Sequence, residues 1–328
     1  MPALPEIAMT PPPIWTPAAR VEGVPTLHDF AAIWQRENTP QWKPSHQRTV
    51  DGCLRFWILP SLGARSLDAV DRADLLAFRA WMHAHARRPS PARVNKVMFI
   101  LLAVLREGAQ RYDYPNPGVM VSALRVVDAE IDPFTLPQMT QILDALAPPW
   151  DDYFATRFYT GLRTGEIDGL CWDSVYLDDA LLVVRRSWVD GAWETPKTQA
   201  GRRDVVLAPP AVDALRRQYC RTRSAGDLVF CSRTGTALNR RNVTRRVWYP
   251  VLDQLGLSRR RAYQTRHTYA TLMLAAGENA EFIRRQLGHR DTQMLFQRYS
   301  RYVPNLTRQD GSAFSALLRS HDAVASCE

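Results

Sequence analysis

One stretch near the C-terminal end of the sequence interrupts apolar helical segments with side chains that can do chemistry. Arg266 and His267 are adjacent, His289 follows a Leu-Gly pair, and Tyr299 and Tyr302 come shortly afterwards. Arginine can hold an oxyanion through two parallel hydrogen bonds, and tyrosine can act as a nucleophile once it is activated. A helix that only packed a core would not need these groups, so the pattern indicates a functional site.

The helices that carry this site can be predicted from the spacing of their apolar residues and from their end signals. Apolar residues recur at helical intervals between positions 272 and 287, Gly277 and Gly288 are natural helix ends, and Asn279 can cap the helix between them. His289 is therefore expected in a turn. A last helix should place the two tyrosines on one face, because they are three residues apart, so spacing alone does not choose between them.

Composition predicts a globular protein with an anionic partner. The chain has 328 residues, of which 46% are hydrophobic, and this is enough for two domains with real cores. The net charge of +9 points to nucleic acid or to a membrane surface. Arginine outnumbers lysine and gathers in pairs in the second half of the chain, which favours nucleic acid, because arginine suits bidentate phosphate contact.

Several other classes of protein are not indicated. The sequence has no run of about 18 apolar residues, and its start, with a Pro11–Pro13 run, lacks the order of a signal peptide. We therefore expect a cytoplasmic protein without a membrane partner. The five cysteines form no CxxC pair and no histidine stands at metal spacing, so neither a disulfide framework nor a metal site is expected.

The first half of the chain predicts an arm, a helical domain and a linker. Residues 1–22 are rich in proline and are expected to form a flexible arm. Residues 23–111 show helical patterns, with one segment at about 45–59 before Pro60 and further starts at Asp71 and Ser90. Basic residues near its helix starts suit phosphate, although each alone is more often a solvated residue. We expect DNA contacts from Lys43, Arg48, Arg93 and Lys96.

The second half predicts a domain at 133–303, after a linker at 112–132. It opens with a capping box at Thr135 and contains strand-like runs at 181–184 and 205–207, with Asp190 and Gly191 as a turn. Helices are expected at about 209–222 and 240–255. The fold class is therefore mainly α with a small antiparallel β-sheet (α+β), and a tail follows at 304–328.

Four separated polar features together resemble the tyrosine recombinase (phage integrase) family. Residues 160–166 read Thr-Gly-Leu-Arg-Thr-Gly-Glu, and Lys197 follows in a loop between strands. Arg266-His-Thr, then Leu-Gly-His289 and Tyr299, complete the set in the family's order. The resemblance covers nearly the whole chain and implies a helical core-binding domain at 23–111 and a catalytic domain at 133–303.

The resemblance implies a role for each matching residue. Arg163 and Arg266 correspond to the arginines that clamp the scissile phosphate, Lys197 to the general acid, His289 to a donor to the phosphate and Tyr299 to the nucleophile. A phosphodiester is very inert, so its cleavage without metal requires cations at the nonbridging oxygens and a tyrosine favoured as phenolate. Lysine can then give a proton to the departing 5′ oxygen.

Three further assignments complete the expected site. Glu166 resembles the acidic residue that orients Arg163. Tyr263 is also expected to be catalytic, because it stands at the general-base position, where most members carry a histidine. His267 is either a buried core histidine or a contact to DNA. In the catalytic domain, DNA contacts are expected from Arg202, Arg240, Arg241, Arg245 and Arg260.

The predicted function is a site-specific DNA recombinase that acts through a 3′-phosphotyrosine intermediate, for integration or excision of a mobile element. No cofactor is expected, since the bond energy is kept in the intermediate. The resemblance implies double-stranded DNA as partner, a synaptic tetramer with a Holliday junction, and possible accessory DNA-bending or directionality factors. The tail at 304–328 docks either on a neighbouring subunit or on its own core. Two alternatives stay open: a type IB topoisomerase-like enzyme and a non-catalytic DNA-binding architectural protein.

Overall fold

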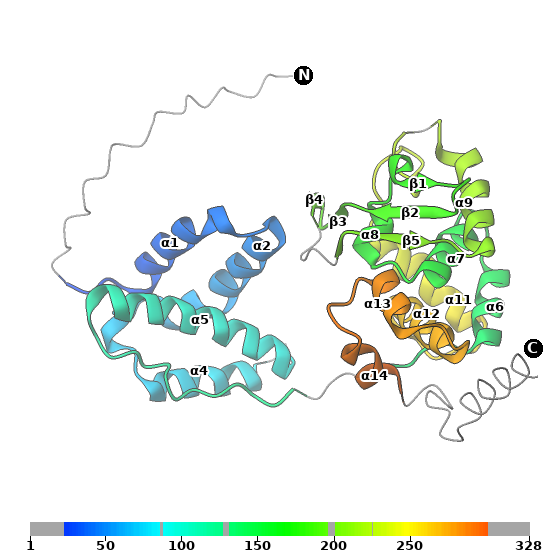
Figure 1. Cartoon of the computed structure of the whole chain (residues 1–328). Helices are drawn as coiled ribbons and strands as arrows, with labels where there is room; N and C mark the ends of the chain where they lie inside the picture. Colours follow the sequence, from blue (N-terminus) through cyan, green and yellow to red (C-terminus); the bar gives the residue numbers. More distant parts are fainter. Residues whose placement is uncertain (1–22, 86–87, 127–130, 196–200, 225, 301–328) are drawn as a thin grey trace, which may run out of the picture. The chain divides into compact units, whose positions relative to one another are not determined.

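The computed structural model describes residues 23–85, 88–126, 131–195, 201–224 and 226–300 (Figure 1). The chain divides into two compact units, Met1–Asp128 and Ala129–Glu328. Within the described ranges, the helices all fall short of the length and apolar character needed to span a membrane.

The first unit is helical, and three of its helices begin at side chains that cap them. Thr26 Oγ1 accepts from the backbone of α1, Asp71 and Asp74 form a reciprocal capping box at α4, and Ser90 caps α5 just before Pro91. The predicted starts at Asp71 and Ser90 are confirmed. The elements are α1 (Leu27–Asn38), 3-10 helix η1 (Thr39–Gln41), α2 (Pro44–Cys53), π-helix η2 (Leu54–Ile58), α3 (Leu59–Leu62), 3-10 helix η3 (Leu67–Ala69), α4 (Arg72–Ala84) and α5 (Pro91–Tyr112).

A π-helical turn carries the chain past a proline in each unit. η2 joins α2 to α3, where Pro60 lies in the first turn, and the Leu59 N–H bonds to the Leu54 carbonyl five residues earlier. The second unit repeats this arrangement before Pro250. A proline inside an α-helix lacks a donor and crowds the preceding turn, and a π turn relieves both problems. The helix predicted to end before Pro60 therefore continues for one more turn.

The second unit combines helices with two small antiparallel sheets. β1, β2 and β5 form one sheet, with Leu182 opposite Val205, and β3 and β4 form a hairpin. Its strands and first helices are α6 (Leu136–Ala145), α7 (Trp150–Thr160), α8 (Thr164–Asp168), 3-10 helix η4 (Trp172–Ser174), β1 (Val175–Tyr176), β2 (Leu181–Val184), β3 (Ser187–Val189), β4 (Ala192–Glu194) and β5 (Arg203–Val206). The later helices are α9 (Pro209–Thr222), α10 (Arg240–Val243), π-helix η6 (Thr244–Trp248), α11 (Tyr249–Gln254), α12 (Gln264–Ala275), α13 (Ala280–Leu287) and α14 (Gln293–Tyr299).

The β3–β4 hairpin forms where the sequence predicts a turn. Asp190 and Gly191 have φ angles of 47° and 87°, the left-handed values that a two-residue hairpin loop requires. Trp188 and Trp193 pair across the strands with ring centroids 5.1 Å apart. The hairpin packs closely on the end of α8, because a Cβ at Gly169 would lie 2.7 Å from Trp188 N.

Two cores hold the second unit together. The larger core surrounds Trp248, which stacks on Phe154 with ring centroids 4.6 Å apart. The smaller core joins α12, α13 and α14, which lie side by side in Figure 1, and it contains Leu287, Leu295 and Tyr299. α13 also packs against β5, so the smaller core is attached to the sheet. This architecture, mainly α with small antiparallel sheets, confirms the predicted fold class.

Candidate active site

Three arginines from three different elements converge on the C-terminal end of α13. Arg163 lies in the turn before α8, Arg203 on β5 and Arg266 on α12. The carbonyl groups at a helix end have no partner within the helix and carry its negative dipole, so they suit cations. The three bonds are Arg203 Nε to Gln286 O at 2.6 Å, Arg266 Nη2 to Leu287 O at 2.6 Å and Arg163 Nη2 to Gly288 O at 3.0 Å.

Two glycines end the helices whose backbone carbonyls contact these guanidinium groups. Gly161 ends α7 and Gly288 ends α13, both in the left-handed conformation with φ of 63°. The Gly161 carbonyl accepts from Arg266 Nη1 at 2.7 Å. A Cβ at Gly161 would lie 2.6 Å from the Tyr269 ring, so this close approach of α7 to α12 requires glycine.

Glu166 is the carboxylate that orients this cluster. It accepts from Arg203 at 3.0 and 2.8 Å, and from Arg163 Nη1 and the Arg163 backbone N–H at 2.8 Å each. Burial raises the pKa of Glu166, but hydrogen bonds to Arg203 and the charges of Arg203, Arg163 and Arg266 outweigh it and lower that pKa to about 2. Among the described residues, three guanidiniums face one carboxylate, so the cluster keeps a net positive charge.

Arg266 is the most enclosed of the three guanidiniums, with 1% of the residue exposed. Burial lowers the pKa of Arg266 to about 10, which leaves the group charged at neutral pH. Both Nη atoms donate to carbonyls, and each carries a second hydrogen that these bonds leave unused. The group can therefore bind a further oxyanion without giving up its present partners.

Tyr299 is buried and hydrogen-bonded to His267. Its hydroxyl lies 2.9 Å from His267 Nδ1, and the tyrosine is 1% exposed. Burial raises the pKa of Tyr299 to about 12, despite the charges of Arg266 and Arg298. Burial also lowers the pKa of His267 to about 4, so this histidine is neutral near pH 7. In this arrangement Tyr299 holds its proton.

His289 lies in the turn after α13, as the helix ends predict. It is 7% exposed, and among the described residues its Nδ1 has no hydrogen-bond partner. Burial, followed by the charges of Arg266, Arg163 and Arg203, lowers the pKa of His289 to about 3. His289 is therefore a neutral imidazole beside the arginine cluster, and its unpaired Nδ1 is buried.

The remaining expected site residues lie nearby or outside the described ranges. Tyr263 precedes the first residue of α12, and its ring meets the His267 ring edge-on at 5.1 Å, with 38% of Tyr263 exposed. Lys197 belongs to residues 196–200 and Tyr302 to residues 301–328, both outside the described residues. The structure thus places Tyr263 at the rim of the site.

Arg203 is a site residue that the sequence analysis missed in favour of its neighbour Arg202. Arg203 is buried and points to Glu166, whereas Arg202 is exposed. The signal was available, because residues alternate between the two faces of a strand. Val205 and Leu207 are apolar and point inward, so Arg203 shares their face and Arg202 does not.

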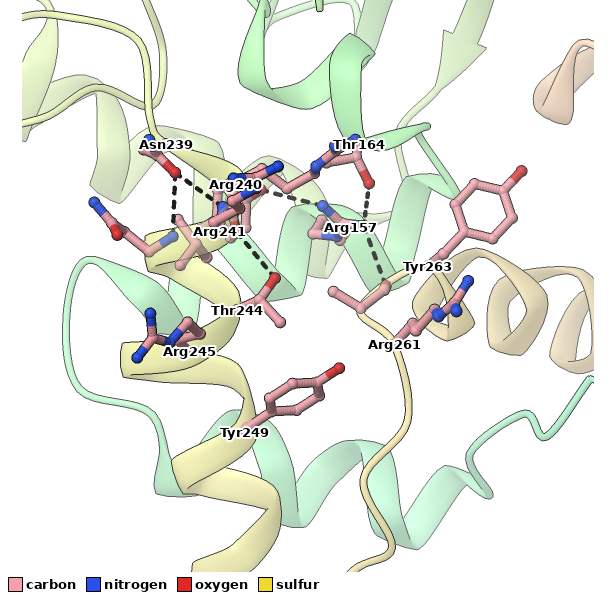
Figure 2. A pocket seen from close by; sticks show the side chains of 14 residues that line it. Arg157, Thr164, Asn239, Arg240, Arg241, Thr244, Arg245, Tyr249, Arg261 and Tyr263 are labelled. Carbon is pink, nitrogen blue, oxygen red and sulfur yellow. Dashed lines mark hydrogen bonds between the residues drawn. The ribbon is translucent and has the colours of Figure 1, made fainter. Parts of the chain in front are cut away.

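A separate pocket of 630 Å³ gathers five arginines next to Tyr263 (Figure 2). We call it the arginine pocket, and its lining residues include no Asp or Glu. Three of its arginines were predicted to contact DNA, and they belong to α10 and η6, whose start Asn239 caps. The five are Arg157, Arg240, Arg241, Arg245 and Arg261.

Other residues predicted to contact DNA lie outside this pocket. Arg260 pairs with Asp132 at 2.6 Å and lies over the Phe134 ring, so its guanidinium is already part of the packing of its domain. The first unit carries the remaining four, of which Lys96 lies over Phe99 with its Nζ 5.7 Å from the ring centroid. These four are Lys43, Arg48, Arg93 and Lys96.

Comparison with known proteins shows that the chain belongs to the phage integrase family. The model of the phage integrase family matches residues 132–305, more than half of the chain. The protein IntQ of Escherichia coli K12, which is described as defective, is 31% identical over 242 residues, 65% of this chain and 61% of IntQ. The prophage integrase IntR of the same strain is 28% identical over 250 residues, 69% of this chain and 61% of IntR. This chain thus spans about three fifths of each of these relatives.

Solved structures show the same fold. The Tn1549 transposon integrase in complex with a circular intermediate DNA superposes with a TM-score of 0.72 and 18% identity, over 90% of this chain and 99% of that one. A lambda integrase dimer bound to a COC′ core site superposes with a TM-score of 0.65 and 16% identity, over 82% and 97%.

Proposed function

Because the chain belongs to the phage integrase family, we propose that it is a site-specific recombinase that cuts and rejoins DNA through a tyrosine-linked intermediate. The observation that carries this proposal is the cluster of three arginines, Arg163, Arg203 and Arg266, around the Glu166 carboxylate. The neutral His289 and the buried Tyr299 lie beside this cluster. Such a cluster suits a phosphodiester, whose nonbridging oxygens gain charge as the bond breaks.

The proposed reaction exchanges one phosphoester bond for another. The Tyr299 hydroxyl gives its proton to water and attacks the phosphorus, and the bond to the 5′ oxygen breaks as Lys197 protonates that oxygen. The products are a 3′-phosphotyrosine and a free 5′ hydroxyl. Attack by a 5′ hydroxyl on the phosphotyrosine reverses the step and rejoins a strand, so neither metal nor nucleotide is consumed.

We assign roles to the surrounding groups from the family resemblance, and their contacts support these roles. Arg163 and Arg266 bind the nonbridging oxygens, and the neutral His289 donates a further hydrogen bond. Glu166 and Arg203 hold Arg163 in place rather than touching the DNA. Tyr299 has to leave its bond with His267 before it can attack, since it is almost fully buried in the free chain.

The wider assignments rest on the relatives and on charge. We assign residues 23–111 to core binding and 133–303 to catalysis, with the tail at 304–328 docking on a neighbouring subunit in a synaptic tetramer. A lambda integrase tetramer has been solved on a Holliday junction, which supports such an assembly. Prophage and transposon integrases among the similar proteins support a mobile element as the host. We propose that the protein acts on duplex DNA in the cytoplasm, with accessory DNA-bending or directionality factors.

Covalent capture tests this function. The wild type and Tyr299→Phe are each mixed with fragments of the source genome and denatured, and any DNA still attached to protein is sequenced. We expect attachment in the wild type alone, because the variant lacks the nucleophilic oxygen, and the attached fragment identifies the target site.

The same fragments separate the alternatives. Joining of two captured sites on plasmids establishes recombination, whereas relaxation of supercoils without joining points to a topoisomerase. Salt-sensitive binding with no covalent adduct from either protein contradicts strand cleavage and indicates an architectural DNA-binding protein.

A further inference from the structure

Arg157 is a buried cation whose hydrogen bonds reach three different segments of the second unit. It lies on α7 and is 1% exposed. Its Nη2 donates to Thr164 Oγ1 and to the Ala262 carbonyl, both at 3.1 Å, and its Nε donates to Thr265 Oγ1 at 3.4 Å. Figure 2 shows Arg157 beside Thr164 with the hydrogen bond between them.

The partners of Arg157 are sequence neighbours of residues to which we assign roles in cleavage. Thr164 directly follows Arg163, and the segment from 262 to 265 contains Tyr263 and leads into Arg266. We propose that Arg157 is a positioning residue for strand cleavage: its guanidinium ties the turn that carries Arg163 to the segment that carries Tyr263 and Arg266. This inference rests on the proposed function.

The charge of Arg157 is balanced through a tyrosine rather than by a direct ion pair. Its Nη1 donates to the Tyr153 hydroxyl at 3.1 Å, and that hydroxyl donates to Asp168 Oδ1 at 2.7 Å. Among the described residues, Arg157 contacts no carboxylate directly. Burial raises the pKa of Asp168, although Tyr153 and Arg157 oppose the shift. With the bond to Tyr153, both terminal nitrogens of Arg157 have a hydrogen-bond partner.

The shape of guanidinium explains why arginine suits this position. Its planar fork presents donors in several fixed directions at once, and here they reach α7, the start of α8 and the segment before α12. Lysine carries its donors on one nitrogen and cannot span these partners. Without the fork, the Ala262 carbonyl and two threonine hydroxyls lose a donor, and the two arginine-bearing segments are no longer tied together.

The test compares cleavage of a charged and an uncharged phosphate. Arg157→Lys removes the planar guanidinium. Thr164→Val is the milder change, because it removes only one acceptor of Arg157. Each variant is given the duplex recovered by covalent capture, nicked so that the covalent product is trapped, with either a phosphodiester or a methylphosphonate at the cleavage position. Single-turnover rates, DNA affinity and melting temperature are measured for both.

We expect the phosphodiester rate to fall about 100-fold in Arg157→Lys and about 10-fold in Thr164→Val, with DNA affinity changed less than about threefold. On the methylphosphonate both variants should match the wild type within about threefold, because that substrate has no charge for Arg163 and Arg266 to clamp. A residue that only supported folding would slow both substrates equally.

Arg217→Lys is the matched control, because Arg217 also reaches α7, through the buried Asp152, without touching either arginine-bearing segment. It should change the melting temperature without changing the ratio of the two rates. Wild-type cleavage by both Arg157 and Thr164 variants, or equal losses on both substrates, overturns the role of Arg157. No covalent product from the wild type itself overturns the proposed function, and this inference with it.

Discussion

Arg203 is the residue that links the carboxylate of the arginine cluster to two neighbouring elements. It makes a two-point contact with Glu166 and a third bond to the Gln286 carbonyl, so it links β5, α8 and α13. Glu166 in turn holds Arg163 by its side chain and its backbone. The orientation of Arg163 therefore depends on Arg203 through one shared carboxylate.

Substitution of Arg203 by lysine should lower cleavage far more than DNA binding. Lysine keeps the charge but cannot make the paired contact with Glu166 or reach Gln286 as well. We expect about a 100-fold slower single-turnover cleavage rate, with DNA affinity within about threefold, measured on the captured duplex. A variant that cleaves at the wild-type rate would contradict the link from Arg203 to Arg163.

The two histidines of the site predict a loss of stability in mild acid. In the folded protein the pKa of His267 is lowered to about 4 and that of His289 to about 3. In the unfolded chain both take up protons below about pH 6.5, so the unfolded state binds more protons and the free energy of unfolding falls as pH drops from there.

Urea denaturation at pH 6.5, 5.5 and 4.5 measures this dependence. His289→Gln should show a shallower fall than the wild type, by at most about 1.4 kcal/mol per pH unit, because one proton-binding group is removed. Carboxylates that titrate in the same range contribute equally to both proteins, so the difference belongs to the histidine. Parallel curves would mean that His289 is not held neutral in the folded protein.

At this scale the sequence predicted site residues by motif and missed those that act through packing. Arg163, Arg266, His289 and Tyr299 belong to recognisable spacings. Arg157 has no such signal, because its partners at 164, 262 and 265 meet it only in the folded chain. Long-range hydrogen bonds of this kind depend on tertiary structure, which a local pattern does not contain.

Among the elements, ends and turns were more predictable than helix interiors. The caps at Thr135 and Asn279 and the turn at Asp190 and Gly191 form as predicted, because each depends on a few neighbouring residues. The π-helical turns before Pro60 and Pro250 were not predicted. Proline alone in a sequence predicts a helix break. Here the helix continues, and the wider π-helical turn before each proline makes room for its ring.

The contact between the β3–β4 hairpin and α8 predicts the effect of one methyl group. In Gly169→Ala the new Cβ would lie 2.7 Å from Trp188 N and 2.8 Å from the Trp193 ring, so the hairpin has to shift. We expect a loss of about 1–3 kcal/mol in the free energy of unfolding, and a change in tryptophan fluorescence.

Gly52→Ala is the control for that substitution. Gly52 lies within α2, and a Cβ there meets no atom within 4 Å. Alanine should stabilise the helix by about 0.5–1 kcal/mol and leave the tryptophan fluorescence unchanged. Equal stability of Gly169→Ala and the wild type would show that the hairpin is free to move away from α8.

At the scale of the whole molecule, the net charge of +9 is carried by the basic residues that have no acidic partner. Many arginines are already paired, as Arg259 is with Asp253, whereas Arg241 and Arg245 lie exposed in the arginine pocket without a carboxylate in its lining. Unpaired cations displace counterions from DNA, so these residues should set the salt dependence of binding.

Arg241→Gln and Arg245→Gln should each reduce the slope of log affinity against log salt concentration by about 0.9, because each variant neutralises one phosphate fewer. Titration of a fluorescent duplex at several salt concentrations measures the slope. Arg259→Gln changes the net charge by the same amount but removes a cation that Asp253 already neutralises, so its slope should match the wild type. An equal decrease in all three variants would mean that overall charge, and not the arginine pocket, governs binding.

The burial of Tyr299 in the smaller core keeps its hydroxyl away from solvent. The tyrosine shares that core with Leu295 on the same seven-residue helix, so its oxygen reaches solvent only when α14 loosens from α12 and α13. In the reaction that we propose, an encounter with DNA that leaves α14 packed would therefore leave both strands intact. Cleavage would require DNA or another molecule to supply the free energy that separates α14 from α12 and α13.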